Sequence, residues 1–449
     1  MPYIPHTSDD LKSMLETIGK KSIDDLFSSI PSKYRLKKDE LKLSNGLSES
    51  EARTAVEGLA GTNKTHQANK RFLGAGSYFH FIPSAINHIT MRSEFYTAYT
   101  PYQPEISQGT LQAVFEFQTM MTRLTGLDVS NASMYDGATA LAEAILVAYH
   151  YKRDKKRSVV IPKNLHPEYF DVLKNYLIPF GMNLVQAEFD KTTGSITNDE
   201  VKKHITSDTF AVVVQSPNFY GVIEQNAAEI AKTAKDNDAV PIMLSIESTS
   251  LGMFKPAGEL GFDIAVLEIQ SFGNPVAFGG PYAGVIVCKK EFTRNMPGRI
   301  IGETKDIDGK RAFVLTLATR EQHIRREKAT SNICSNQALV ALRSSIYLTL
   351  MGEDGLKELA KTNYALAHYA NDALAKVGAK AMFSGVFYNE FAVQFSSKAV
   401  RDNVCQGLKT EGFLPGYKLG ENGLLITVTE LNDKAGIEAY VDALGRYSK

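Results

Sequence analysis

The sequence predicts an α/β protein: a large domain with a mostly parallel sheet, preceded by an N-terminal helical arm and followed by a smaller C-terminal α+β domain. The chain has 449 residues, more than one hydrophobic core usually holds. Between about residues 70 and 290, short apolar runs alternate with amphipathic helical patterns, which is typical of parallel strands joined by helical crossovers. The residues before this region show only helical patterns. We therefore expect three parts, over residues 1–65, 66–325 and 326–449.

Composition and charge exclude several classes of protein. Lysine plus arginine and aspartate plus glutamate both total 50, so no net charge favours nucleic acid or an acidic membrane. Cys288, Cys334 and Cys405 are too few and too scattered for a disulfide framework or a zinc site, which suits a reducing compartment. The chain start carries no basic region followed by an apolar run, and no run of about eighteen apolar residues exists. We predict a cytoplasmic protein with no membrane span and no metal.

The N-terminal arm is predicted to be helical. Ser8 can cap a first helix that Gly19 closes, and a short second helix covers residues 23–27. Ser48 and Glu51 have the spacing of a capping box, which predicts a third helix ending near residue 61. Such an arm rarely makes a core alone, so we expect it to lie across another subunit or across the main domain.

The large domain is predicted from its strands and helices in order. Its helices are expected at residues 167–176, 199–205 and 224–238. Its strands read as continuous apolar runs, as in strands buried on both faces; they cover residues 159–161, 184–185, 210–214, 242–245, 264–269 and 283–287.

The small domain is predicted to begin with a long helix at residues 337–351. Two more helices follow, at residues 354–377 and 398–411. Strands are expected at residues 391–395 and 423–428, which gives an α+β arrangement.

A turn of small residues, Ser133 to Thr139, precedes a helical run that begins at Ala140. Free backbone N–H groups and the positive end of the helix dipole suit a phosphate there, with Gly137 and Thr139 as candidates. The alternative is a glycine-containing cap that lets the helix pack closely on the sheet.

Two further candidates follow predicted strands. His166 could stack on a flat cofactor, or it could cap the next helix. Glu247 follows the strand at 242–245, where a carboxylate could pair with a pyridinium nitrogen, or it could be one more surface acid.

A segment dense in tyrosine and proline, residues 96–105, is expected to be extended because its prolines disfavour a helix. Tyr96, Tyr99, Tyr102 and Gln103 give it a rigid, amphipathic contact surface. We expect it to line a pocket, either of this chain or of a partner; the alternative is a packed crossover before a helix that begins near Gln108.

The run from Arg320 to Lys328 is locally basic and could grip a carboxylate or an acidic partner. Alternatively it is the solvated face of a helix or a linker. No P-loop, dinucleotide fingerprint, metal-ligand spacing or Ser-His-Asp arrangement stands out in the sequence.

Several ordered segments together resemble the signatures of the glycine decarboxylase P-protein family, and the likeness runs from Pro5 to near the C-terminus. The chain is similar to the N-terminal-half type of that family, known as subunit 1. The resemblance implies a fold-type-I architecture of pyridoxal phosphate (PLP) dependent transferases. The segments are residues 73–83, 99–109, 132–139, 215–221 and 320–334.

The resemblance also points to a missing lysine. In the other half of the family the PLP lysine follows a histidine, and alignment on Gly261 to Phe272 places that histidine at Gln270 and the lysine at Ser271. A hydroxyl cannot form the imine that holds PLP. Glu247 falls where the pyridinium-pairing acid is expected and His166 near the ring-stacking position, so these, with Gly137 and Thr139, are expected to be remnants of a cofactor site.

The family's chemistry implies a subunit of glycine dehydrogenase (decarboxylating, aminomethyl-transferring) that is inactive alone. Its expected partner is a PLP-bearing subunit 2, in a hetero-oligomer of two plus two. Together they are expected to decarboxylate glycine and pass the aminomethyl group to the lipoyl arm of the H-protein. We expect this chain to have no catalytic residue of its own and to contribute its tyrosine segment in trans.

Two other interpretations remain open. The chain could be a purely structural partner of the PLP subunit, with no residue in the active site. It could also be a stand-alone PLP enzyme using another lysine, of which Lys255 and Lys289 are nearest. Lys289 follows a strand and should therefore lie at the wrong end of its element.

Overall fold

A computed structural model provides the structure, which describes residues 5–36, 38–153 and 155–448. The chain divides into two compact units, Met1–Thr65 and His66–Lys449, and each is described by itself. The further division of the second unit near residue 325 stays a prediction.

The first unit is helical, as predicted. α1 (Ser8–Thr17) begins with a capping box in which Thr7 and Asp10 bond each other's backbone, so the cap is Thr7 and not Ser8. α2 (Glu49–Ala60) is capped by Ser48 and Glu51, as their spacing predicts. Neither helix buries a residue. Shorter 3₁₀ turns cover Ile23–Phe27, Ser32–Tyr34 and Lys38–Leu41.

A seven-stranded sheet organises the second unit, in the order β1-β7-β6-β5-β4-β2-β3. The strands from β2 to β6 pair in parallel, while β7 is antiparallel to both of its neighbours. The mostly parallel sheet is therefore confirmed. The strands are β1 (Val129–Ser130), β2 (Ser158–Pro162), β3 (Asn183–Ala187), β4 (Thr209–Gln215), β5 (Val240–Ser245), β6 (Ile264–Glu268) and β7 (Gly284–Cys288).

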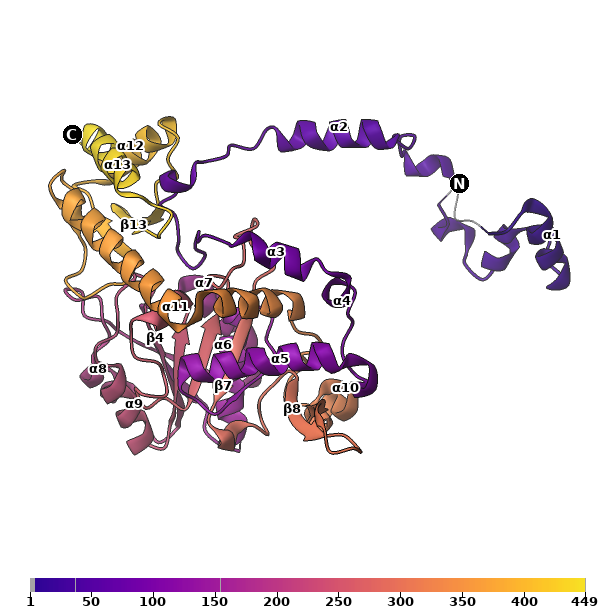
Figure 1. The fold of residues 1–449 in the computed structure, drawn as a ribbon, viewed down its shortest axis with the longest axis horizontal. Helices are drawn as coiled ribbons and strands as arrows, with labels where there is room; N and C mark the ends of the chain where they lie inside the picture. The colour runs from indigo at the N-terminus through magenta and orange to yellow at the C-terminus, as the bar shows by residue number, and fades with distance from the viewer. Residues whose placement is uncertain (1–4, 37, 154, 449) are drawn as a thin grey trace. The chain divides into compact units, whose positions relative to one another are not determined.

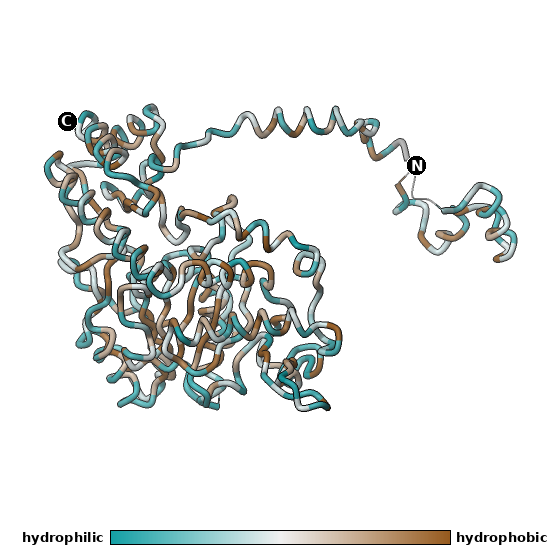
Figure 2. The backbone as a smooth tube through the Cα atoms, viewed as in Figure 1, coloured by the Kyte–Doolittle hydropathy of each residue, from teal (hydrophilic) through white to brown (hydrophobic). Residues whose placement is uncertain are grey.

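Helices cover both faces of this sheet (Figure 1). One face packs on α6 (Gly137–Tyr151) and α7 (Pro167–Leu177), and the other on α5 (Pro104–Thr125), α9 (Ala227–Asp236) and α11 (Ala338–Ala375). Successive residues of a strand point to opposite faces, so the strands must be apolar throughout. The tube coloured by hydropathy is accordingly brown along the central strands (Figure 2).

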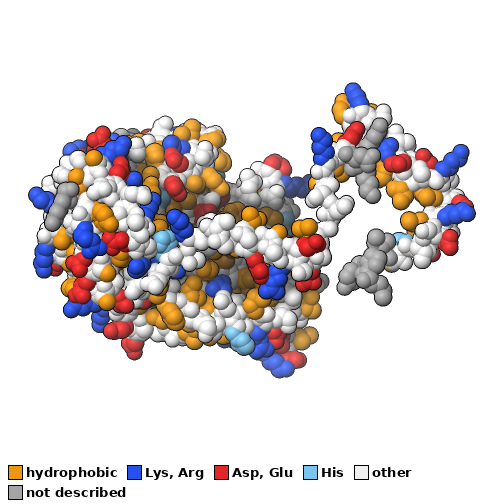
Figure 3. Space-filling model, turned by 90° about the horizontal axis from the view of Figure 1, so that it is seen from above, with side chains coloured by type: hydrophobic (Ala, Val, Ile, Leu, Met, Phe, Trp, Pro, Cys, Tyr) orange, Lys and Arg blue, Asp and Glu red, His pale blue; other side chains and the backbone are white. Residues whose placement is uncertain are grey.

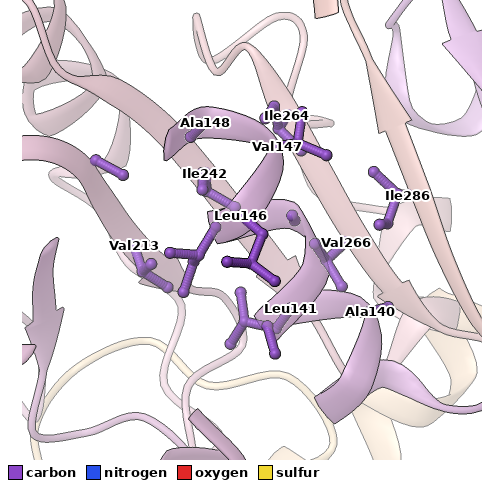
Figure 4. Packing of buried hydrophobic residues seen from close by; sticks show 14 of the residues in the cluster. Ala140, Leu141, Leu146, Val147, Ala148, Val213, Ile242, Ile264, Val266 and Ile286 are labelled. Atoms are coloured by element: carbon purple, nitrogen blue, oxygen red, sulfur yellow. The ribbon is translucent and has the colours of Figure 1, made fainter. Parts of the chain in front are cut away.

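α6 is the most deeply buried helix on its face. Every residue from Ala140 to Tyr149 is buried, and Leu141 and Leu146 lie among β-strand residues such as Ile242 and Val266 (Figure 4). This packing fixes the start of α6 relative to the end of β6 and the beginning of β7. There, Met134 pairs with Gly284, the first residue of β7.

A second, four-stranded antiparallel sheet lies in the C-terminal part, in the order β10-β11-β13-β12. Its core includes residues of α11 and of two helices that follow, α12 (Lys398–Thr410) and α13 (Lys434–Tyr447). α11 is divided at Gly352, whose backbone angles (φ 61°, ψ −173°) are not helical, into two helical segments, as predicted on either side of residue 352. The strands are β10 (Lys380–Ala381), β11 (Glu390–Gln394), β12 (Tyr417–Leu419) and β13 (Gly423–Thr427).

The remaining elements lie around the main sheet. β8 (Ile300–Lys305) and β9 (Arg311–Thr316) form a hairpin that the sequence reading did not predict. None of the helices among the described residues is long and apolar enough to cross a membrane. Charged side chains of both signs are interspersed on the face of the molecule seen in Figure 3. The other helices are α3 (Ser84–Thr90), α4 (Ser93–Tyr96), α8 (Asn198–His204) and α10 (Gln322–Arg325).

Candidate functional site

The ends of β5 and β6 bring the two central candidates into direct contact. Ser271 donates a hydrogen bond from its Oγ to Oε2 of Glu247 at 2.9 Å. Oε1 of Glu247 accepts from the backbone N–H of Thr249 at 3.1 Å and also from the Thr249 hydroxyl. Glu247 and Ser271 are both buried, so Glu247 is not a surface acid. The sequence assigned both residues to one former coenzyme site, and in the fold their side chains are in contact.

His80, which the sequence reading did not single out, completes this cluster. Its Nε2 lies 3.3 Å from Oε2 of Glu247, and its Nδ1 lies 2.8 Å from Oε2 of Glu430. Burial disfavours the imidazolium, but the carboxylates of Glu430 and Glu247 outweigh it and raise the pKa of His80 to about 10. The cluster is thus a buried cation between two carboxylates. His80 lies within the segment 73–83 quoted above, so that signature carried a signal for it.

The predicted phosphate position, at the start of α6, holds a carboxylate of this chain. Glu268, at the end of β6, accepts hydrogen bonds from the backbone N–H groups of Gly137 at 2.8 Å and Gln270 at 3.0 Å. The N–H of Thr139 is taken by Asp136, the helix cap, at 2.8 Å. Burial raises the pKa of Glu268 to about 8.

The side chain of Gln270 bonds to backbone groups next to this cluster. Its side chain is buried, accepts from the N–H of Tyr78 at 2.8 Å and donates to the carbonyl oxygens of Tyr78 and Asn274. Gln270 therefore ties the segment before His80 to the turn that follows β6.

His166 caps α7, which was the alternative to ring stacking. Its Nδ1 accepts from the N–H of Glu168 at 3.3 Å, and its Nε2 lies 2.9 Å from the carbonyl oxygen of Ala75. Burial lowers the pKa of His166, which favours the neutral form of the ring. His166 and Glu268 both line a cavity of about 580 Å³ beside the start of α6.

The residues present do not fit PLP. A pyridinium nitrogen bound to Glu247 would compete with the Ser271 hydroxyl, which already donates to this carboxylate. The phosphate of the coenzyme would meet the Glu268 side chain, which already accepts the hydrogen bond of the Gly137 N–H. Ser271 supplies no amine for an imine. The same positions are filled by polar groups that satisfy one another.

Neither alternative lysine reaches this cluster. Lys289 follows β7, which runs antiparallel to β6, and so lies at the opposite edge of the sheet from the ends of β5 and β6. Its Nζ pairs with Asp263 at 2.6 Å. Lys255 has an exposed side chain.

The tyrosine segment lies apart from the buried cluster. Tyr96 ends α4, residues 98–103 form neither helix nor strand, and Gln103 caps α5. The prediction of an extended segment over 96–105 is wrong at its two ends, because Tyr96, Pro104 and Glu105 are helical. α5 opens with Pro104 at the first helical position, but Ser107 has non-helical angles (φ −123°, ψ 19°), so the regular helix runs from about Gln108, as predicted. The side chains of Tyr96, Tyr99 and Tyr102 are exposed by 57%, 84% and 50%, so the segment offers a broad apolar surface.

The basic run at residues 320–328 forms short turns and α10. Arg320 donates from Nη2 to the carbonyl oxygen of Gly298 at 2.8 Å. Arg325, Arg326 and Lys328 are exposed, which matches the alternative of a solvated surface.

Comparisons with known proteins agree with these features. The family profile for the glycine cleavage system P-protein matches residues 1–444. Proteins called probable glycine dehydrogenase (decarboxylating) subunit 1 are similar over almost the whole chain. The one from Desulfitobacterium hafniense is 45% identical, covering 99% of each chain, and the one from Moorella thermoacetica is 47% identical, also covering 99% of each.

Solved structures extend the likeness to three dimensions. A crystal structure of glycine decarboxylase (P-protein) of the glycine cleavage system, in inhibitor-bound form, covers 100% of both chains with a TM-score of 0.89 and 38% identity. The glutamate decarboxylase of Lactobacillus brevis shares the fold alone, with a TM-score of 0.68 at 12% identity, covering 94% of this chain and 97% of its own. The predicted fold class, fold-type-I PLP-transferase-like, is confirmed. The chain belongs to the glycine cleavage system P-protein family.

Proposed function

We propose that this chain is subunit 1 of glycine dehydrogenase (decarboxylating), and that it acts with a lysine-bearing subunit 2. That partner carries PLP, and the pair decarboxylates glycine and passes the aminomethyl group to the lipoyl arm of the H-protein. The support is the name shared by relatives that match the chain over its length. Two copies of each subunit and a cytoplasmic location belong to the same proposal; the three free cysteines suit a reducing compartment.

One observation carries the proposal: the polar side chains at the former coenzyme site are already hydrogen-bonded to groups of this chain. Ser271 donates a hydrogen bond to Glu247, and Glu268 accepts the N–H of Gly137 at the start of α6. These buried polar groups are satisfied within the chain, so a coenzyme would have to break bonds already made. The catalytic chemistry therefore belongs to a partner, and this chain contributes surface to it.

The test is to purify this chain, a lysine-bearing homologue and their co-expressed complex. Glycine–bicarbonate exchange is measured on each, because it reports the decarboxylation step without the downstream enzymes. We expect exchange by the complex and none by this chain alone. Borohydride treatment of this chain with added PLP tests the same point chemically. A coloured, reducible adduct on the isolated chain would overturn the proposal.

The tyrosine segment is our candidate for a contribution in trans. Tyr99 and Tyr102 are the natural test positions because their hydroxyls are accessible and are not needed to fold this chain. Under the proposal, Tyr99→Phe and Tyr102→Phe leave the complex intact and lower its exchange rate. Tyr369→Phe, on exposed α11 surface where the hydroxyl bonds Glu438 at 2.8 Å, is the matched control.

A purely structural partner is the second candidate. The exposed aromatic surface of the tyrosine segment favours it equally, since buried aromatic side chains stabilise interfaces without taking part in chemistry. Unchanged exchange by an intact complex that carries both tyrosine substitutions would favour the structural role.

A further inference from the structure

A cavity of about 240 Å³ lies beneath the tyrosine segment, apart from the cluster around Ser271. It is enclosed by the segment itself, by α5, by the start of α11 and by the residue before β8, elements that lie together in the fold (Figure 1). Its walls are mostly apolar, with Phe95, Val114, Ile301 and Leu339 among them. If the wall of the cavity carried no charge, the cavity would suit a purely apolar molecule.

The wall does carry one charge, the guanidinium of Arg299. This side chain is only 6% exposed. Its Nη1 donates to Oδ1 of Asn336 at 3.0 Å and its Nη2 to the carbonyl oxygen of Cys334 at 2.9 Å. The ring of Tyr102 lies 5.6 Å from the guanidinium carbon. All of these partners are neutral.

Arg299 has no anionic partner among the residues that the structure describes, and its Nε has no hydrogen-bond partner there. A buried charge left without a counter-charge is costly, and a cation–π contact with one ring offsets only part of that cost. Arg401, equally buried, shows the usual solution in the same chain: its Nε pairs with Asp402 at 2.9 Å. The Arg299 guanidinium is therefore fixed in place, desolvated and without an anion.

We propose that this cavity binds a small molecule with one carboxylate and a short apolar body. The carboxylate binds the Arg299 guanidinium, which lines the cavity, because a planar group of N–H donors matches a carboxylate in shape and charge. The bonds to Asn336 and Cys334 hold the guanidinium in advance, so little freedom is lost on binding. The apolar body lies against Val114 and Leu339. The volume is below the roughly 300–1,000 Å³ typical of drug-sized ligands, which favours a short body.

The test uses the full-length chain and two probes of equal length, hexanoate and hexanamide, in isothermal titration calorimetry. They differ in charge and share the same chain. We expect hexanoate to bind at least about tenfold more tightly. In Arg299→Gln the preference for the carboxylate should disappear. Arg123→Gln removes an exposed arginine from α5, one of the elements that enclose the cavity, and should leave the preference unchanged.

Leu339→Trp provides a second variant, since a larger side chain fills the cavity without removing charge. Hexanoate binding should be lost in it while circular dichroism stays that of the wild type. Equal affinity of the wild-type chain for the two probes overturns the proposal, and so does binding of neither at millimolar concentration. A carboxylate preference that survives in Arg299→Gln overturns it as well. These readouts measure binding by the isolated chain and so do not depend on the proposed enzyme function.

Discussion

At the scale of single residues, the buried cluster is held together by the charges of His80, Glu247 and Glu430. The sequence predicted that Glu247 and Ser271 mark a former coenzyme site, and the fold brings them together. It did not predict His80, Glu268 or Glu430, because each is paired with residues far along the chain. Glu268 left a signal: a carboxylate within an otherwise apolar, buried strand requires a partner.

Replacing His80 tests how strongly the cluster is coupled. His80→Ala leaves the carboxylates of Glu247 and Glu430 buried without their shared cation. Breaking a buried pair in this way typically costs about 3–5 kcal/mol of unfolding free energy. We expect a loss of that size in urea denaturation at pH 7. His88→Ala, at an exposed position of α3, should change stability by less than about 0.5 kcal/mol. Equal stability of His80→Ala and wild type would contradict the assigned charges.

Glu268 gives the folded state a pH dependence of known sign. Its pKa in the fold is about 8, raised by burial above the ordinary value of 4.5 for a glutamate. The folded state therefore holds the proton more tightly, and the resulting stability is complete below about pH 4.5 and lost as the pH rises through about 8. Between pH 5 and pH 9, wild type should lose more stability than Glu268→Gln. Parallel curves for the two proteins, measured by chemical denaturation, would show that Glu268 is ionised throughout.

At the scale of elements, most of the main sheet followed from its apolar runs. The hairpin β8–β9 did not, because its strands are only partly buried and mix polar with apolar residues. α13 was missed although Ile437, Tyr440 and Leu444 recur at helical spacing, and all three are buried in the C-terminal core. The break at Gly352 was predicted, and the non-helical angles of this residue divide α11 into two helical segments as expected.

The start of α6 depends on a glycine for space rather than for backbone freedom. A Cβ at Gly137 would lie 2.5 Å from the Tyr169 hydroxyl and 2.9 Å from Cβ of Glu268. Gly137→Ala should therefore destabilise the chain by about 1–3 kcal/mol, as overpacking of a close-packed region does. Gly109→Ala is the matched control, because a Cβ there meets nothing within 4 Å.

The two glycine variants separate crowding from helix propensity. Gly109 lies inside α5, so its replacement by alanine should stabilise the chain by about 0.4–1 kcal/mol or leave it unchanged. The unfolding temperature should fall for Gly137→Ala and not for Gly109→Ala. A shift in the same direction for both variants would show that the close approach of Tyr169 and Glu268 is not the reason for a glycine at position 137.

At the scale of the whole molecule, the two units differ in how they are stabilised. Every hydrophobic cluster lies within residues 66–449, and the described helices of residues 1–65 bury no residue. The capping box of α2 was predicted from Ser48 and Glu51, because its bonds span three residues, while the cap of α1 was expected at Ser8 and lies at Thr7. What covers the apolar faces of these helices could not be predicted, since that depends on surfaces distant in sequence or on another chain.

The arm therefore yields a prediction about assembly. Leu11, Met14 and Ile18 of the first helix are exposed, and helices of 10 and 12 residues are marginal in water without packing. In the isolated chain, limited proteolysis should cut within residues 5–65 before it cuts the sheet-containing unit, because cleavage follows local opening. In the complex with a lysine-bearing subunit 2, the same sites should become protected, and deletion of the arm should weaken the complex while the unit at 66–449 still folds. Equal protection of the arm in the isolated chain would instead mean that its apolar face is covered by its own main domain, and the contribution of this chain to a partner would then depend on the tyrosine segment alone.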